Sequence, residues 1–202
     1  MQIIRTRTVI IRIPMGIIPI IIILTTIIRA EISQTTITDS KKDKTMKEYT
    51  YKKMGIDDLE LLVSSRVMVL KAANKLPDDT DMSEIERQSR EYYKKAFAED
   101  SHTAYLVFDG DRLIGAGGMS YYTVMPTCCD TTGRKAYVMN MYTDPEYRRQ
   151  GIAYKTLDLL VADAKARGID HITLEATDMG RPLYEKYGFV QMPSEMQFRG
   201  KR

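Results

Sequence analysis

Residues 136–177 carry the pattern that most limits how this chain can fold. An apolar strand over 136–143 is followed by a helix that ends at Gly168 and by a second strand over 169–177. Apolar side chains recur on one face of the helix, at Ile152, Leu157, Leu160, Val161 and Ala164. Two strands joined by such a helix lie parallel in one sheet, with a right-handed crossover. The unit therefore predicts an α/β fold.

The remaining segments predict that a mostly antiparallel sheet surrounds this unit. Residues 81–84 read as a capping box that opens a helix ending near Ala98. The turn Asp109-Gly110-Asp111 predicts a hairpin, and the glycines between 115 and 118 predict a bulge or a close backbone approach. The other expected elements are strands at 48–54, 103–108, 112–122, 189–192 and 195–199 and helices at 57–74 and 180–187. The expected order is β α α β β β α β α β β.

The start of the helix after the strand at 136–143 has an unusual composition. A helix usually begins with Ser, Thr, Asp or Asn, whose side chain accepts a hydrogen bond from a free backbone N–H group. Arg149, Gln150 and Gly151 stand there instead. Backbone N–H groups without an acceptor, together with nearby positive charge, favour an anionic ligand. The alternative is a solvated basic loop before an ordinary surface helix.

Residues 1–45 differ in composition from the rest and are interpreted separately. They contain fifteen isoleucines by position 37, and the apolar stretch 13–28 is interrupted by Pro14, Gly16 and Pro19. A signal anchor and a disordered or β-prone tail are two interpretations. We favour a third, in which translation starts at Met46 and the earlier residues are upstream sequence. The expected domain is therefore 46–202, without a membrane anchor.

The charge balance and the cysteines exclude several classes of protein. Residues 1–45 hold seven basic and three acidic residues, so the remaining chain has 23 basic and 24 acidic residues, a net charge of −1. A balanced charge gives no support for nucleic-acid binding. Cys128 and Cys129 are adjacent and have no ligand partners at metal-binding spacing. We expect no metal site, no disulfide framework and a cytoplasmic location.

Two motifs resemble those of the GNAT superfamily of acyl-CoA-dependent N-acyltransferases. The first is YTDPEYRRQGIA at residues 142–153, in which Arg148, Gly151 and Ala153 match the pyrophosphate loop of that family. The second is LYEKYGFV at residues 183–190. The resemblance covers about residues 46–200. It implies the GNAT fold, a mixed and mostly antiparallel sheet with a splayed parallel strand pair, and acetyl-CoA as the co-substrate.

The resemblance also implies where coenzyme A binds. Backbone N–H groups from Arg149 to Ala153 would donate to the diphosphate, and small residues there would let it approach the main chain. The last residues of the preceding strand would bind the pantetheine arm as a further strand. The cofactor-binding residues expected from the resemblance are Met141, Tyr142, Thr143, Arg148, Arg149, Gln150, Gly151, Ile152, Ala153 and Tyr184.

Three residues are expected to act in catalysis. The backbone N–H of Met141 would polarise the thioester carbonyl. Glu175 resembles the glutamate that serves as the base in ribosomal-protein alanine N-acetyltransferases, and a water chain is the alternative base. Tyr184 matches the tyrosine that protonates the departing thiolate. Thr177 and Gly180 stand where the family often has Asn and Ala, which leaves the lower part of the coenzyme site undefined.

The acceptor is an amine that the sequence does not identify. An acidic cluster near residues 78–86 would attract a cationic amine, or it is a solvated helix entrance. Tyr121, Tyr122 and the cysteine loop are further candidates for the acceptor pocket, whereas His102 is interpreted as structural or exposed. We favour a small primary amine. For the acceptor, the alternative is a protein N-terminus or lysine. For the whole protein, the alternatives are an acyl-CoA-binding regulator without turnover and a membrane-tethered form. A homodimer is one candidate for the oligomeric state.

Overall fold

The computed structural model describes residues 47–193 and 195–198. The predictions made for residues 1–45, including the anchor, the tail and the start at Met46, lie outside the described residues. In the part of the chain that the structure describes, no helix is both long and apolar enough to span a bilayer.

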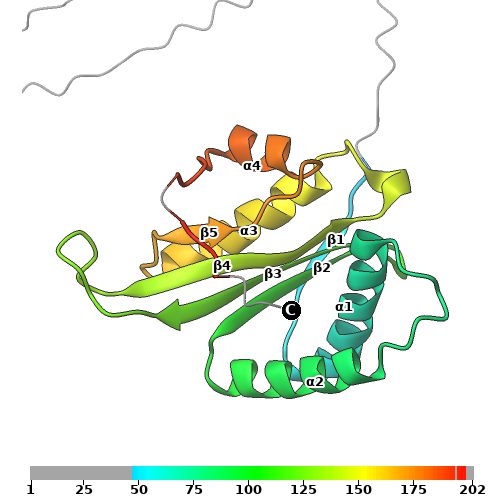
Figure 1. Ribbon diagram of the computed structural model, residues 1–202. Coiled ribbons are helices and arrows are strands. Elements are labelled where there is room, and N and C mark those ends of the chain that lie inside the picture. The colour runs from blue at the N-terminus through cyan, green and yellow to red at the C-terminus, as the bar shows by residue number, and fades with distance from the viewer. Residues whose placement is uncertain (1–46, 194, 199–202) are drawn as a thin grey trace, which may run out of the picture. The chain divides into compact units, whose positions relative to one another are not determined.

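A five-stranded sheet forms the centre of the fold (Figure 1). Its strands lie in the order β1-β2-β3-β4-β5, and β4 with β5 is the parallel pair, whereas the other neighbours are antiparallel. The α/β fold predicted from the strand-helix-strand unit is therefore confirmed. The strands are β1 (Thr50–Lys53), β2 (His102–Asp109), β3 (Arg112–Thr123), β4 (Arg134–Thr143) and β5 (Ile172–Leu174).

Helices cover both faces of this sheet, with α1 and α2 on one face and α3 and α4 on the other (Figure 1). The apolar stripe of α3 explains its position, because Leu157, Leu160 and Ala164 have no exposed surface and pack on Ala136 and Val138 of β4. The helices are α1 (Leu59–Asn74), α2 (Ser83–Ala98), α3 (Ile152–Ala166) and α4 (Arg181–Tyr187), with 3₁₀ turns η1 (Ile56–Asp58) and η2 (Pro145–Tyr147).

The two predicted C-terminal strands are wrong for the described residues, because 189–193 and 195–198 form no strand. Their alternating apolar side chains are not buried: Val190 is 84% exposed and Phe198 is 94% exposed. Alternation of apolar and polar residues predicts a strand only when one face of that strand packs on a core. In addition, Pro193, between the two expected strands, has no backbone N–H to donate to a neighbouring strand. The strand expected at 169–177 is also shorter, since β5 ends at Leu174.

The predicted capping box does not form. Met82 is the residue that precedes α2, and no side-chain hydrogen bond caps this helix. Asp81 instead accepts a 2.9 Å hydrogen bond from the backbone N–H of Ser83. The Glu84 side chain accepts hydrogen bonds from Arg87 at 2.7 and 2.8 Å, so it does not turn back to the helix start.

The glycines of β3 mark both a bulge and a close approach, as predicted. Gly118 pairs with Met139 and Ala116 pairs with Tyr142, so two residues of β4 lie opposite Gly117 alone. A Cβ on Gly117 would lie 2.6 Å from the Thr156 Cγ2 of α3. The glycine therefore lets α3 lie directly on the sheet beside the bulge.

Candidate active site

The outer edge of β4 is free of β5 over its last five residues. The parallel pairs end at Val138 with Leu174, whereas β4 continues to Thr143. We call residues 139–143 the splayed segment. Backbone groups on a strand edge without a neighbour can hydrogen-bond an extended ligand. This is the region in which the resemblance implied that the arm of coenzyme A would bind.

Asn140 shapes the splayed segment. Its φ of 56° lies in the left-handed region, which Asn tolerates better than most residues. It lies next to Met141 in the two-residue bulge opposite Gly117, and the Arg66 Nη1 of α1 donates a 3.0 Å hydrogen bond to its Oδ1. Sequence reasoning missed both Asn140 and Arg66, although an Asn opposite the glycines of β3 is a usable signal for a bulge.

The loop before α3 forms an open backbone cradle, which we define as residues 149–153. Arg149 and Gly151 have φ values of 63° and 82°, and no side chain caps α3. The Lys155 N–H donates to the Gly151 carbonyl at 3.0 Å, so the three preceding helical N–H groups have no partner within the helix. A Cβ on Gly151 would meet nothing within 4 Å. Such left-handed turns at a helix start aim N–H groups at an anion.

Side chains hold this loop at the end of the splayed segment. Arg148 Nε donates a 3.3 Å hydrogen bond to the Thr143 carbonyl, and Gln150 accepts one from the Tyr49 hydroxyl. The Arg112 guanidinium binds the carboxylates of Asp144 and Glu146 at 2.9 and 2.7 Å. Arg149 is exposed. These contacts join the loop to the end of the splayed segment.

Thr143 carries a polar atom that the described residues leave unsatisfied. Its Oγ1 is buried and has no hydrogen-bond partner in the described part of the chain. A buried hydroxyl without a partner is costly, so such atoms often mark the place of a ligand or water. The open cradle, the free edge of β4 and this hydroxyl together fit a ligand with an anionic end and an amide-rich arm, as in coenzyme A.

Tyr184 lies on α4 beside the parallel strand pair. It is 9% exposed, and burial raises the pKa of its phenol above the ordinary value. Its hydroxyl forms no hydrogen bond with another described residue. A pocket of about 240 Å³ adjoins it, lined by β5, by α4 and by residues 189–192. Tyr184 belongs to the apolar cluster beneath α3, and Met141 packs against the same cluster.

Glu175 lies one residue beyond the end of β5 and is exposed. Glu175 lies near Tyr137 of β4, whose phenol pKa is raised by burial and by the charge of Glu175, against a lowering effect of a hydrogen bond with the Glu175 backbone. No described contact joins Glu175 to Tyr184. Its role as the base stays a prediction.

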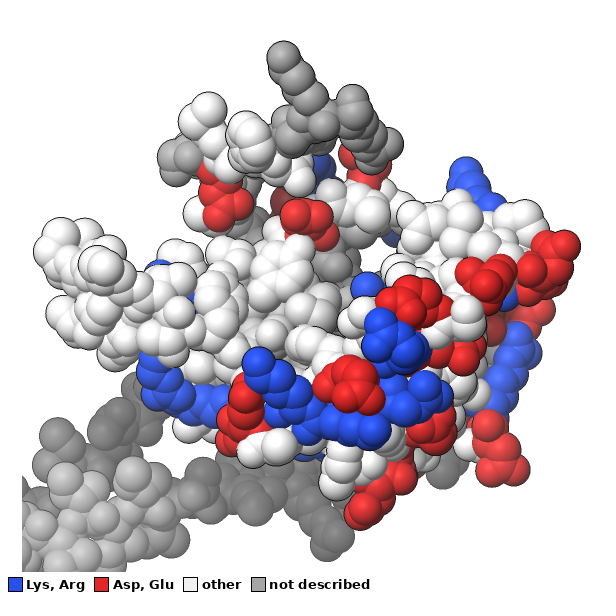
Figure 2. All heavy atoms as spheres, turned by 60° about the horizontal axis from the view of Figure 1, so that its bottom comes forward, with Lys and Arg blue, Asp and Glu red and all other residues white. Residues whose placement is uncertain are grey.

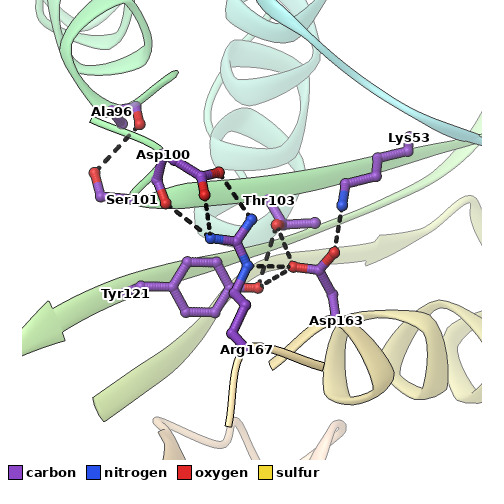
Figure 3. Close-up of polar contacts among 8 residues, drawn as sticks. All are labelled: Lys53, Ala96, Asp100, Ser101, Thr103, Tyr121, Asp163 and Arg167. Carbon is purple, nitrogen blue, oxygen red and sulfur yellow. Dashed lines mark hydrogen bonds and ion pairs between the residues drawn. The ribbon is translucent and has the colours of Figure 1, made fainter. Parts of the chain in front are cut away.

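Other candidate residues lie in different environments. The Tyr121 hydroxyl donates a 2.7 Å hydrogen bond to Asp163 of α3, so it faces α3 (Figure 3). Tyr122 is 44% exposed on the opposite face of β3. His102 is buried, as one of the two sequence interpretations expected, and Tyr92 lies 3.1 Å from its Nδ1. Tyr121 is therefore part of the interior of the fold.

The two cysteines lie at the end of the β3–β4 hairpin and are exposed free thiols. Within residues 47–193 and 195–198, no group of three His, Cys, Asp or Glu side chains could hold a metal ion. Two further predicted cofactor-binding residues have side chains that pack in or against the core. The Ile152 side chain is buried under the cradle, and the Tyr142 side chain packs toward α1 and α2.

Comparison with known proteins assigns the class of this fold and site. The model of the acetyltransferase (GNAT) family matches residues 70–189, more than half of the chain. The chain therefore belongs to the GNAT acetyltransferase family. A similar solved structure is a predicted acetyltransferase of Clostridium acetobutylicum with acetyl-CoA, which has 32% identity and a TM-score of 0.68. The match covers 75% of this chain and 96% of that one.

Curated relatives match over shorter regions. The uncharacterized N-acetyltransferase YsnE of Bacillus subtilis is 27% identical over 92 residues, which is 43% of this chain and 55% of that protein. The [ribosomal protein bS18]-alanine N-acetyltransferase of Escherichia coli K12 is 29% identical over 99 residues, 48% of this chain and 62% of that protein. The chain thus spans 46–62% of the length of the curated relatives it matches.

Proposed function

We propose that this protein transfers the acetyl group of acetyl-CoA to a primary amine by direct attack, without a covalent enzyme intermediate. The observation that carries the proposal is the joint placement of the open cradle and the splayed segment. An anion at the cradle and an extended arm along β4 would meet at Thr143. The Clostridium acetobutylicum relative, crystallised with acetyl-CoA, supports the same ligand for this chain.

In this proposal the residues of the cradle bind the diphosphate of acetyl-CoA and orient the coenzyme. The N–H groups of Gly151 to Ala153 donate to the diphosphate, and Arg148 and Arg149 add charge-assisted contacts. Tyr142, Thr143 and the other residues of the splayed segment hold the arm. Acetyl-CoA supplies an acetyl group activated as a thioester. The Met141 N–H, beside the bulge at Asn140, polarises the acyl carbonyl, and one such donor is worth about 3 to 4 kcal/mol in other acyl transfers.

Two protons must move when an amine is acetylated. An alkyl ammonium with a pKa near 10.4 gives up a proton before it attacks, and we assign this proton to Glu175 or to a water chain. Tyr184 donates a proton to the leaving sulfur, and the second proton that leaves the attacking nitrogen returns to the Tyr184 phenolate, directly or through water. The raised pKa of Tyr184 keeps the phenol protonated at neutral pH, and its buried position leaves a thiolate poorly solvated, which favours proton transfer to sulfur.

We favour a small primary amine as the acceptor. A protein N-terminus is the second candidate, because the similar Escherichia coli protein is a ribosomal-protein alanine N-acetyltransferase. A non-catalytic acyl-CoA-binding regulator would bind acetyl-CoA and release no thiol. We place the activity in the cytoplasm, whose reducing conditions suit the free thiols of Cys128 and Cys129, and leave monomer and homodimer open.

Two measurements test this proposal. The first is release of free thiol from acetyl-CoA in the presence of amine and peptide panels. The second is calorimetric binding of coenzyme A to Gly151→Asp, with Gly168→Asp as the matched control. Both glycines have positive φ, open surroundings and a place at one end of α3, so they share the backbone strain. We expect only Gly151→Asp to abolish binding, and equal losses in both variants would contradict the cradle.

A further inference from the structure

Arg66 projects from α1 to the bulge of β4. The residue is half-buried, and its Nη1 donates a 3.0 Å hydrogen bond to Asn140 Oδ1. This contact places a guanidinium beside the splayed segment, next to the residue whose N–H we assign to the acyl carbonyl. The bond uses one of the five N–H donors of the guanidinium.

The charge of Arg66 has no carboxylate partner in the described residues. Its hydrogen-bond acceptor is the neutral amide of Asn140, and the ion pairs of residues 47–193 and 195–198 do not include it. Arg90 pairs with Glu60, and Arg167 pairs with Asp100 and Asp163. Arg181 of α4 is also half-buried and has no ion pair among the described residues, so what distinguishes Arg66 is its place at the bulge. Removing a cation from water without a partner is costly, so a half-buried unpaired arginine favours an anionic ligand.

Arg66 also lies on the side of the sheet from which an acceptor would approach. Its neighbours Leu62 and Val63 pack on Leu106 and Ala116, whereas α3 and its cradle lie on the opposite face. When a ligand is bound at the cradle, the side of the sheet on which α1 lies is still accessible to the second substrate. Figure 2 shows one face of the molecule, on which Lys, Arg, Asp and Glu side chains gather in the lower and right-hand parts and a mainly uncharged area lies at the left.

We propose that the acceptor amine carries an anionic group, a carboxylate or a phosphate, that Arg66 binds in a bidentate contact. This inference rests on the proposed acetyltransferase function and narrows it to one class of acceptor. A guanidinium matches the two oxygens of a carboxylate or phosphate, so it orients the acceptor as well as attracting it.

The experiment uses pairs of amines that differ only in the anionic group. The pairs are the common L-amino acids with their amides, and O-phosphoethanolamine with ethanolamine. Calorimetry measures their binding to the protein with and without coenzyme A, and thiol release gives kcat/KM. In the wild type we expect the best anionic acceptor to exceed its neutral partner by about tenfold or more in both measurements. The two anion types show whether carboxylate or phosphate is preferred.

Variants separate recognition of the anion from support of the bulge. Arg66→Gln removes the charge and is expected to bring the ratio between paired amines to about one. Asn140→Gly keeps the left-handed backbone and removes the contact with Arg66. It should weaken both members of a pair alike and preserve the ratio. A ratio near one in the wild type, or a ratio that survives Arg66→Gln, would overturn the inference.

The outcomes distinguish this inference from the proposed function. Absence of coenzyme A binding and of thiol release would remove the acetyltransferase proposal, while the amine-binding ratios would still test Arg66. Thiol release with equal use of anionic and neutral amines would keep the enzyme and remove the acceptor class.

Discussion

Gly117 of β3 lies in direct contact with Thr156 of α3. A Cβ at residue 117 would stand 2.6 Å from Thr156 Cγ2 and 2.9 Å from Met141 Sδ. The Thr156 side chain cannot easily move away from residue 117, because it is 1% exposed and its Oγ1 donates a 3.0 Å hydrogen bond to the Ile152 carbonyl. One missing side chain therefore sets the distance between α3 and the splayed segment.

Gly117→Ala is expected to reduce stability and coenzyme A affinity together. Forcing one methyl group into a packed interior costs about 1 to 3 kcal/mol, and displacement of Met141 would disturb the splayed segment. Thermal unfolding and calorimetry measure the two effects. Gly55→Ala is the control, because a Cβ at Gly55 would meet nothing within 4 Å. Equal stability of both variants would show that α3 adjusts freely.

Asp163 of α3 joins the helix to three strands. Its carboxylate accepts hydrogen bonds from Thr103, Tyr121 and Arg167 at 2.7 to 2.8 Å and pairs with Lys53 (Figure 3). Burial alone would raise the pKa of this carboxyl. The hydrogen bonds lower it by more, so the pKa lies below its usual range.

Asp163→Asn is expected to destabilise the fold by about 2 to 3 kcal/mol at pH 7, because hydrogen bonds to a charged group are lost. The depressed pKa means that the carboxylate contributes its full stabilisation above pH 4, and that this contribution is lost as the pH falls further. Urea unfolding at several pH values measures the difference. Glu91→Gln, which breaks an exposed pair with Lys94, should change stability by less than about 0.5 kcal/mol. A difference that did not shrink in acid would contradict this assignment.

Local signals in the sequence predicted a large part of this structure. The apolar stripe of α3 predicted its packing face, and Arg149 to Gly151 predicted an uncapped helix start, because both depend on residues close in the chain. The strands expected at 189–192 and 195–199 failed for the converse reason. A strand forms only where a partner edge and a core face are present, and a short alternating pattern specifies neither.

The features that sequence reasoning missed join residues far apart in the chain. Arg66 meets Asn140 across 74 positions, and Tyr121 meets Asp163 across 42. No local sequence pattern marks such a pair, because each of these residues, considered alone, is of a type that is common on a solvated surface. The buried hydroxyl of Thr143 is similar: its residue was a predicted ligand, but its lack of a partner emerges only once the sheet and the cradle are packed.

His102 predicts a pH dependence of stability. Burial among the rings of Tyr92, Tyr93 and Phe97 lowers the pKa of its imidazole to about 4. In the unfolded chain the imidazole takes up a proton near pH 6.5, whereas in the folded protein it does so only near pH 4. Between these values the unfolded state binds the proton more strongly, so stability falls as the pH is lowered. About 3 kcal/mol of stability should therefore be lost between pH 6.5 and 4. Urea unfolding of the wild type and His102→Gln measures it, and the same acid sensitivity in both would contradict the prediction.

Tyr184→Phe is expected to lower kcat by about a hundredfold, a typical contribution of a general acid. Stability should stay unchanged, because the hydroxyl has no hydrogen-bond partner among the described residues. Since burial raises the phenol pKa, wild-type activity should fall only above pH 10, and this alkaline limb should be absent in the variant. Tyr187→Phe, which loses a hydrogen bond to Asp158, is the control and should keep its kcat. Unchanged turnover in Tyr184→Phe would assign the proton donor elsewhere.

Thr143→Val tests the fit of the splayed segment to coenzyme A without altering the shape of the side chain. The buried Oγ1 has no partner in the described residues, so its removal should leave the ligand-free protein unchanged or about 1 kcal/mol more stable. Coenzyme A affinity should fall by about three- to tenfold if the hydroxyl bonds the arm. Thr156→Val is the matched control, because its buried hydroxyl is satisfied by the Ile152 carbonyl. It should lose about 1 kcal/mol of stability and keep its affinity. The opposite pattern, with stability lost and affinity kept at Thr143, would show that this hydroxyl supports the strand and that coenzyme A lies away from β4.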